Sequence, residues 1–225
     1  MLKKPVTLFN SQKEALSKLE KIFLQDSAQN TLILSGESGS GKSTAVKEFL
    51  SGFQGPVRGY TTVRHRSSGR NQLAFQHILL PLSAAPAELT LEYPDELPAD
   101  LEYFLYRDED KVDFDRSAFL RLAAYMSPEQ TYQYEAPELM LWDEVGGEEL
   151  LIDRFFELLL YWLDQNDKPV QIIVWKKQGL RSKLRLGHLT AADLDLLARR
   201  RQQILGHPSV NYHDLDSDGS EIIYT

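Results

Sequence analysis

A glycine-rich segment near the start of the chain has the residue types and the spacing needed to hold phosphate groups. Residues 36–43 read Gly-Glu-Ser-Gly-Ser-Gly-Lys-Ser and fit the pattern G-x-x-x-x-G-K-[ST] at every defined position. Glycines let the backbone curl so that successive N–H groups and a helix N-terminus point at the same phosphate oxygens. The pattern predicts that Lys42 reaches the β- and γ-phosphates and that the Ser43 hydroxyl takes a magnesium position.

Two adjacent carboxylates supply the second half of the predicted site. Asp143 and Glu144 follow the apolar run Leu139-Met140-Leu141-Trp142. A carboxylate at the carboxyl end of a buried strand can hold magnesium, so Asp143 is predicted to share the metal with Ser43. A neighbouring carboxylate can orient and deprotonate a water for attack on the γ-phosphorus, which makes Lys42 and Glu144 the predicted catalytic residues. The plain alternative is that Asp-Glu caps the helix that follows.

The complete set of predicted nucleotide-binding residues is Gly36, Glu37, Ser38, Gly39, Ser40, Gly41, Lys42, Ser43 and Thr44. Phosphoryl transfer also benefits from a cation on the developing charge, and Arg64 and Arg70 are candidates for an arginine finger. The run Lys176-Lys177…Arg181…Lys183…Arg185 is a further candidate. It could also be the lid of a kinase or bind a nucleic acid or an acidic partner, although solvated loop charge is the favoured interpretation.

The elements that must position these motifs alternate between strands and helices. Apolar runs and alternation predict strands at 31–34, 57–65, 72–80, 139–142, 170–175, 210–212 and 222–224, the second and third forming a hairpin. Helical spacing predicts helices at about 11–25, 42–51, 115–126, 150–163 and 190–205, the last with a Thr190 to Asp193 cap. A strand, helix, strand order implies parallel crossover units and an α/β fold.

Length and composition favour one P-loop domain over the whole chain, residues 1–225. The chain has 225 residues and is 42% hydrophobic, enough for one sizeable core. Residues 1–30 are predicted to be a helical extension that precedes the core fold. Residues 81–105 contain four prolines, six acidic residues and no Lys or Arg, which predicts an exposed, irregular acidic insertion.

Charge and residue usage limit the partners that we expect. The net charge is -8, so the overall field repels phosphate backbones and nucleic acid is an unlikely ligand, whereas a protein partner stays possible. There is no cysteine, no signal-peptide pattern and no apolar run of the ~18 residues that a membrane helix needs. We therefore expect a cytoplasmic protein that does not enter a membrane.

Three stretches together resemble a known family: GESGSGKST, then VRGYTTVR with Gly69-Arg70 beyond it, then LMLWDEVGGEEL. They are similar to the small P-loop nucleoside-triphosphatases known from thermophiles and widespread in bacteria and archaea. The resemblance implies a three-layer α/β fold with a central, mainly parallel sheet. It also implies magnesium-dependent hydrolysis of several nucleoside triphosphates to diphosphate and phosphate, with little base selectivity.

By position, the resemblance assigns the family's roles to Lys42, Ser43, Asp143 and Glu144, and its later glutamate and its arginines to Glu149, Arg64 and Arg70. The chain departs from the pattern where Thr62 replaces a usual glutamate and where Gly147-Glu148 replaces the pair before the later glutamate. Other readings of the loop are a nucleotide or small-molecule kinase and a partner-activated ATP-binding switch. A transporter-type ATPase is disfavoured because the Leu-Ser-Gly-Gly-Gln signature is absent.

Two further patterns have plain interpretations. Asp214-Leu215-Asp216-Ser217-Asp218-Gly219 copies the opening of a calcium loop, but Thr225 stands at the twelfth position, so a hairpin turn is the expected structure. Arg199, Arg200 and Arg201 are expected to complement the negative end of the last helix.

Overall fold

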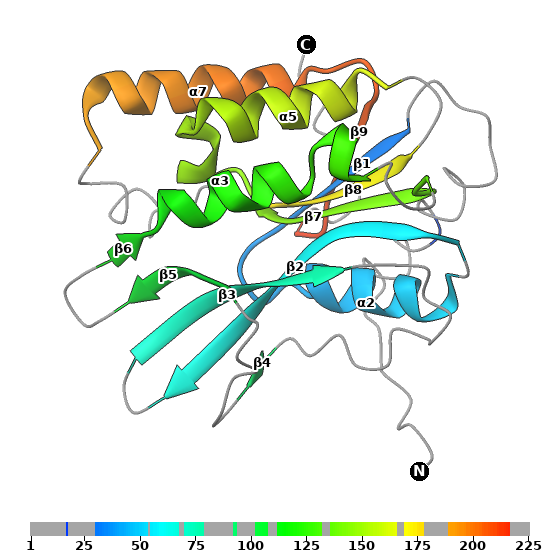
Figure 1. Cartoon of the computed structure of the whole chain (residues 1–225), viewed down its shortest axis with the longest axis horizontal. Coiled ribbons are helices and arrows are strands. Elements are labelled where there is room, and N and C mark those ends of the chain that lie inside the picture. Colours follow the sequence, from blue (N-terminus) through cyan, green and yellow to red (C-terminus); the bar gives the residue numbers. More distant parts are fainter. Residues whose placement is uncertain are drawn as a thin grey trace.

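The computed structural model of the chain describes residues 17, 30–53, 55–67, 70–78, 92–93, 102–107, 112–131, 136–165, 169–177 and 189–216. One mixed sheet lies at the centre of this structure, with strand order β6-β5-β3-β2-β7-β8-β1-β9 and β4 paired to β2 (Figure 1). The strands are β1 Thr31–Ser35, β2 Val57–Ser67, β3 Arg70–Ile78, β4 Glu92–Tyr93, β5 Glu102–Arg107, β6 Val112–Phe114, β7 Leu139–Val145, β8 Val170–Trp175 and β9 Val210–Asp214. The helices are α2 Lys42–Gly52, α3 Arg116–Tyr125, α4 Pro128–Thr131, the 3-10 turn η1 Glu148–Leu151, α5 Asp153–Leu163 and α7 Ala191–Leu205.

The sheet has a parallel half and an antiparallel half. Strands β2, β7, β8, β1 and β9 pair in parallel with their neighbours, whereas β3, β5 and β6 extend the sheet beyond β2 in antiparallel pairs. Parallel strands end at the same edge, so the segments that follow β1, β7, β8 and β9 are brought together there. This carboxyl edge is where an open α/β sheet usually binds its ligand.

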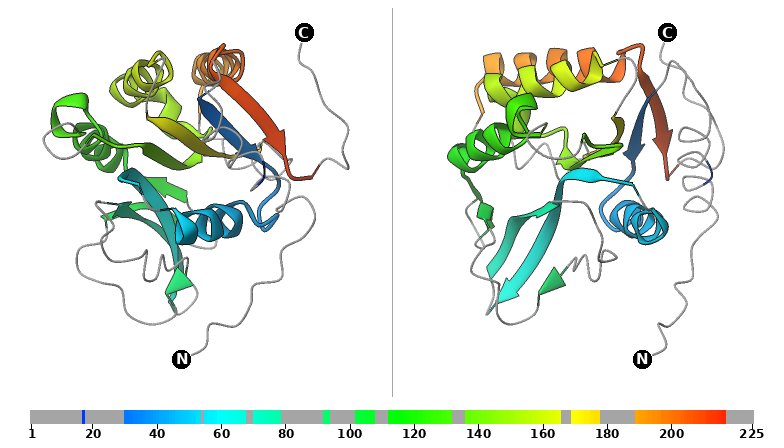
Figure 2. Two further views of the ribbon diagram at one scale, coloured as in Figure 1. Left: turned by 90° about the vertical axis from the view of Figure 1, so that its right-hand side faces the viewer. Right: turned by 45° about the vertical axis from the view of Figure 1, so that its right-hand side comes forward.

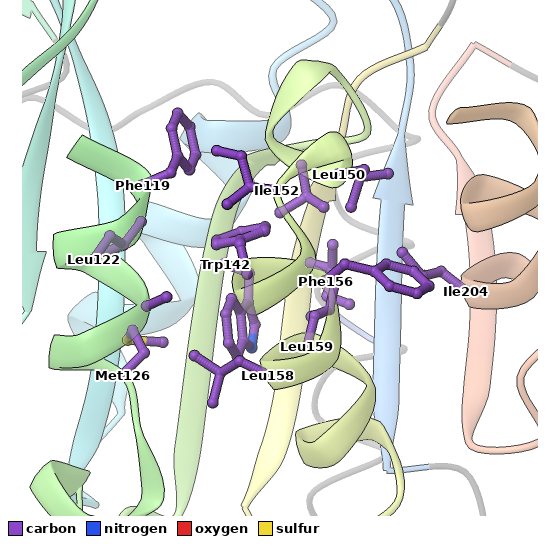
Figure 3. Close-up of a cluster of buried hydrophobic side chains, with 14 of the residues drawn as sticks. Phe119, Leu122, Met126, Trp142, Leu150, Ile152, Phe156, Leu158, Leu159 and Ile204 are labelled. Carbon is purple, nitrogen blue, oxygen red and sulfur yellow. The ribbon is translucent and has the colours of Figure 1, made fainter. Parts of the chain in front are cut away.

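Helices cover both faces of the sheet, as two views show plainly (Figure 2). Alternate residues of each buried strand serve opposite faces. Leu32 and Leu34 of β1 pack in the cluster that contains Val46 and Leu50 of α2. Ile33 packs in the larger cluster, which joins the sheet to α3, α5 and α7 (Figure 3). Helix, sheet and helix form three layers, so the predicted α/β fold class with a central, mainly parallel sheet is confirmed.

Local sequence features explain where the helices on the larger cluster begin. Asp115 caps α3, because its carboxylate accepts hydrogen bonds from the backbone N–H groups of Ser117 and Ala118. Thr190 and Asp193 form a reciprocal capping box at the start of α7, as the sequence predicts. None of the helices in the described part of the chain is long and apolar enough to cross a membrane.

A glycine sets the distance between two strands that carry site residues. Gly59 of β2 lies opposite Leu141 of β7, and its φ is +141°. A Cβ atom at this position would clash with the backbone carbonyl of Leu141. Glycine therefore permits the close approach of β2 to β7.

Most predicted elements are confirmed, and three predictions need correction. The predicted strand at 139–142 continues through Asp143 and Glu144, which lie inside β7. The predicted helix at 150–163 is instead the turn η1 followed by α5, which begins at Asp153. The predicted irregular insertion 81–105 extends too far, because β5 begins at Glu102 and pairs with β3.

Several predictions lie outside the described residues. They include the helix at about 11–25, the strand at 222–224, the turn at 217–219 and most of the insertion 81–105. Of the basic run at 176–185, the structure describes only Lys176 and Lys177.

Candidate nucleotide-binding and catalytic site

The phosphate loop connects β1 to α2 at the carboxyl edge of the sheet. Gly39 and Gly41 have φ values of +90° and +88°, in the left-handed region that residues with side chains rarely adopt. Gly41 is the residue before α2, so the free N–H groups of the first helical turn face the loop. The predicted segment Gly36 to Thr44 therefore has the strand, loop and helix context that a phosphate-binding loop requires.

The loop lysine is buried among groups of the loop itself. The Lys42 ammonium donates hydrogen bonds to the carbonyl oxygens of Gly36 at 2.7 Å and Glu37 at 2.8 Å. Burial lowers the pKa of Lys42, while carboxylates raise it, Glu144 foremost, followed by Asp216, Asp143 and Asp214. The loop lysine therefore interacts electrostatically with the predicted base Glu144 and the predicted metal ligand Asp143, although Lys42 begins α2 and the two carboxylates belong to β7.

The metal-ligand candidate Asp143 is held by a neighbouring strand. Its Oδ2 accepts hydrogen bonds from the backbone N–H of Thr62 at 2.7 Å and from the Thr62 hydroxyl at 3.0 Å. Burial, and after it the charge of Glu144, raises the pKa of Asp143 to about 7. Thr62 stands where the resembled family has a glutamate, and a threonine can donate to a carboxylate where an ionised glutamate cannot.

The other oxygen of this carboxylate fits a hard cation. Asp143 Oδ1 is buried and has no hydrogen-bond partner among the described residues. It borders a small hollow whose polar lining includes Ser43 and Thr61. Oxygen atoms are the ligands that magnesium prefers, and magnesium at phosphate sites takes few of them from the protein. Ser43 and Asp143 thus offer oxygens that fit magnesium, and their role as its ligands stays a prediction.

The predicted base Glu144 has an unusual backbone and a cationic neighbour. Its φ of +62° is positive, and no other non-glycine residue in the described part of the chain shares this feature. Its carboxylate lies 3.6 Å from the Lys176 ammonium, which lies at the same distance from Glu149. Burial alone would lower the pKa of Lys176, but Glu149 and Glu144 raise it. Lys176 is therefore a cation held between two carboxylates.

Glu149 fixes the turn that follows Glu144. Its side chain is fully buried, and it accepts hydrogen bonds from the backbone N–H groups of Gly146 and Gly147. The resemblance singled out Glu149 without a role, and the structure gives it this local one. A glutamate three residues after a glycine is the sequence feature that could have indicated the turn.

Two arginines of α7 contact this region, which corrects the expectation that they complement the end of their own helix. Arg201 donates to the carbonyl oxygens of Gly146 and Lys176 and lies over the Trp175 ring at 4.7 Å. Arg200 donates to the carbonyl of Leu150 at 2.7 Å. Helix α7 lies alongside η1, so the guanidinium groups reach carbonyls across the interface rather than along the helix.

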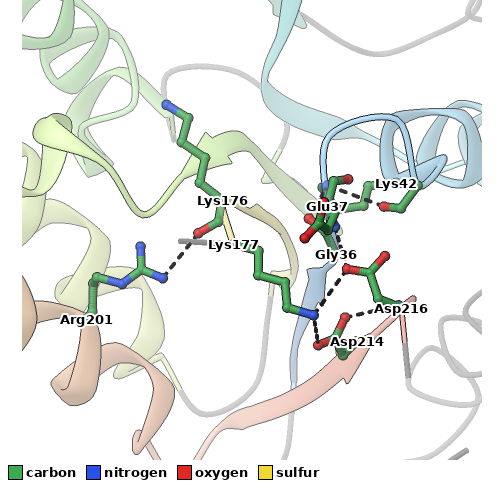
Figure 4. Close-up of polar contacts among 9 residues, drawn as sticks. Gly36, Glu37, Lys42, Lys176, Lys177, Arg201, Asp214 and Asp216 are labelled. Atoms are coloured by element: carbon green, nitrogen blue, oxygen red, sulfur yellow. Dashed lines mark hydrogen bonds and ion pairs between the residues drawn. The ribbon is translucent and has the colours of Figure 1, made fainter. Parts of the chain in front are cut away.

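The end of β9 is fastened to the phosphate loop, a contact that the sequence did not predict. Lys177 lies 2.8 Å from Asp214 and 3.1 Å from Asp216, and the backbone N–H of Glu37 donates to Asp216 at 2.6 Å (Figure 4). The hydrogen bond to Asp214, and then that to Asp216, raises the pKa of Lys177. Within the described residues, no three His, Cys, Asp or Glu side chains form a group that could hold a metal ion. The turn expected at 217–219 lies outside those residues.

The arginine-finger candidates are only partly placed. Arg64 lies in β2 opposite Leu73, and Arg70 begins β3 opposite Ser67. Their side chains lie outside the described part of the structure. Arg181, Lys183 and Arg185 fall wholly outside it, so their predicted roles stay predictions.

Comparison with known proteins gives one structural similarity. No family model matches the chain, and no curated protein matches it. A crystal structure of THEP1 from the hyperthermophile Aquifex aeolicus matches 85% of this chain and 93% of its own, with a TM-score of 0.47 and 14% sequence identity.

Proposed function

We propose that this protein is a magnesium-dependent nucleoside-triphosphatase that converts a nucleoside triphosphate to the diphosphate and phosphate. The observation that carries the proposal is the meeting of Lys42, Ser43, Asp143 and Glu144 at the carboxyl edge of the sheet. A phosphate-binding loop alone would support binding only. A carboxylate beside the metal-ligand candidate adds the group that hydrolysis needs.

The chemistry follows from the placement of these residues. The loop N–H groups and Lys42 would hold the β- and γ-phosphates, and the carbonyl bonds of Lys42 show that its ammonium already lies within the loop. Bound magnesium, on Ser43 and Asp143, would neutralise charge on the phosphates. Glu144 would accept a proton from water as the water oxygen bonds to the γ-phosphorus and the bond to the bridging oxygen breaks.

Lys176 bears on the position of the base. Its ammonium lies 3.6 Å from the Glu144 carboxylate, and this ion pair orients the side chain that would accept a proton from water. The same ion pair also supports a second candidate function, a partner-activated switch. In that function Lys176 would restrain Glu144 until a partner releases it, and hydrolysis by the isolated protein would be slow.

Phosphate release from ATP, GTP, CTP and UTP, with magnesium and with EDTA, tests the proposal. We expect turnover of all four with similar rates, because the resemblance implies low base selectivity, and loss of turnover with EDTA. Binding of nucleotide without phosphate release would contradict the hydrolase and favour the switch. Phosphate transfer only to an added acceptor would favour a kinase.

A further inference from the structure

A buried hydroxyl beside the candidate metal site has no hydrogen-bond partner among the residues that the structure describes. Thr61 of β2 is 4% exposed, and its Oγ1 is buried without a hydrogen bond to any described residue. Leaving a buried polar group unpaired destabilises a protein, and such groups in native proteins usually have a hydrogen-bond partner. A ligand bound at this position would provide one.

The sheet places this hydroxyl next to the metal-ligand candidate. The parallel pairing of β2 with β7 runs to Tyr60 opposite Trp142, so Thr61 and Asp143 are the next residues on the two strands. Both lie two residues after the pair Gly59 and Leu141, and side chains two apart on a strand share a face. Leu141 packs on the face that α2 covers, and α2 carries Ser43.

One hollow joins the three residues. Ser43, Thr61 and Asp143 line it together with the apolar side chains of Val46, Leu141 and Val174 and with Lys47. Thr62 donates two hydrogen bonds to Asp143 Oδ2. Asp143 Oδ1 and Thr61 Oγ1 are both buried beside this hollow and have no hydrogen-bond partner among the described residues. The apolar side chains on the remaining walls offer these two oxygens no partner, so an ion or a water molecule bound beside them would supply one.

We propose that the Thr61 hydroxyl is a further residue of the magnesium–nucleotide site and hydrogen-bonds a water molecule of the ion. This inference rests on the proposed function, because the ion arrives with the nucleotide. Thr61 is not among the residues to which the resemblance assigns a role. Thr61 positions the metal's water shell and takes no part in bond breaking.

The test compares Thr61→Val, which removes the hydroxyl at nearly constant shape, with Thr61→Ser, which keeps it. Binding of Mn²⁺ to each protein, measured by electron paramagnetic resonance with a non-hydrolysable ATP analogue, reports the metal site without turnover. We expect Thr61→Val to weaken Mn²⁺ binding by about tenfold. Loss of a residue that hydrogen-bonds a direct ligand of a metal ion typically lowers the metal affinity 10–100-fold. Thr61→Ser should stay near the wild type.

Thermal unfolding of the free protein separates this role from a structural one. Removing an unpaired buried hydroxyl should leave the stability of the nucleotide-free protein unchanged or raise it. Unchanged Mn²⁺ affinity in Thr61→Val, or a loss of stability in the free protein, would overturn the inference. Ser43→Ala is the control, because it should lose Mn²⁺ whether or not Thr61 contributes. If the wild type binds no Mn²⁺ with the analogue, the proposed function itself fails.

Discussion

Glu144 combines a strained backbone with a paired side chain. A positive φ in a non-glycine residue costs on the order of 1 kcal/mol and persists where the surrounding structure enforces it. Here the contacts that enforce the backbone conformation lie on the next turn. Glu149 accepts hydrogen bonds from the N–H groups of Gly146 and Gly147, and Arg201 donates to the Gly146 carbonyl. At the residue scale, Glu149 and Arg201 fix the turn after the predicted base, and Lys176 pairs with its side chain.

Replacing Lys176 tests whether it positions Glu144 or restrains it. Lys176→Met removes the cation shared by Glu144 and Glu149, so we expect phosphate release to fall by about tenfold, within the range that general-base catalysis contributes. Nucleotide affinity should change little, because neither carboxylate is expected to contact the nucleotide. Steady-state kinetics and equilibrium binding of a labelled nucleotide give the two values.

Lys176→Arg is the matched control, since it keeps the positive charge and should retain most of the activity. A higher rate of phosphate release in Lys176→Met would contradict the positioning role. That result would instead support the partner-activated switch, in which Lys176 holds the base inactive.

At the scale of elements, the phosphate loop depends on the ends of β8 and β9. Lys177 follows β8 and pairs with Asp214 and Asp216 at the end of β9, and Asp216 accepts from the loop N–H of Glu37. Without the lysine, two carboxylates would face the loop uncompensated. We therefore expect Lys177 to anchor the loop through Asp216 and to shield a bound phosphate from the two carboxylates.

Lys177→Met should weaken nucleotide binding by about fivefold or more, because loss of the anchor and loss of the shielding charge both disfavour binding. One charged hydrogen bond is worth about 1.5–3 kcal/mol when it is buried. The pair is partly exposed, so a smaller effect than the buried value is expected. Isothermal titration with ADP and magnesium measures the change, and Lys177→Arg serves as the control. Equal affinity of Lys177→Met and the wild type would show that the loop needs no such anchor.

The capping residue of α3 governs a helix that covers the antiparallel half of the sheet. Asp115→Ala removes the acceptor for the N–H groups of Ser117 and Ala118, which should lower the free energy of unfolding by about 1 kcal/mol. Asp115→Asn keeps a capping oxygen and should lose less. Urea unfolding at pH 7 measures both changes, and an unaltered midpoint in Asp115→Ala would contradict the capping role.

The pH dependence of this cap has a definite sign. The hydrogen bond from the Ser117 hydroxyl is the main cause that lowers the pKa of Asp115 in the folded protein. A carboxyl with a lowered folded pKa stabilises the protein above its unfolded pKa, near 3.9, and loses that contribution as pH falls through the folded value. The stability difference between the wild type and Asp115→Asn should therefore be present at pH 7 and shrink below about pH 4. A difference that grows on acidification would contradict this assignment.

At the scale of the whole molecule, the sequence predicted what local patterns encode. The apolar run before residues 36–43 predicted β1, and glycine spacing with Lys42 predicted the loop and the start of α2. The adjacent Asp143 and Glu144 were predicted from their place after a second apolar run. Each of these predictions needed only a short window of sequence.

Contacts between distant segments were not predictable in this way. Glu37 and Asp216 are separated by 179 positions, and no pattern in either segment indicates that the two are in contact. The bonds of Arg201 to Gly146 and Lys176 depend on how α7 packs, which the sequence of α7 alone does not specify. Acidic composition predicted an irregular segment over residues 81–105, but β5 begins within it at Glu102. The prediction failed there because pairing of β5 with β3 outweighs the local composition.

The most direct test of the central claim is the Glu144→Gln variant, compared with the wild type in both phosphate release and nucleotide binding. The account predicts a fall in phosphate release of at least about 100-fold, because the amide cannot accept the proton from water, with nucleotide affinity nearly unchanged. The glutamine keeps the side-chain length, so the turn at residues 144–147 should persist. Full hydrolysis by Glu144→Gln would contradict the assignment of Glu144 as the base and with it the hydrolase mechanism proposed for this site.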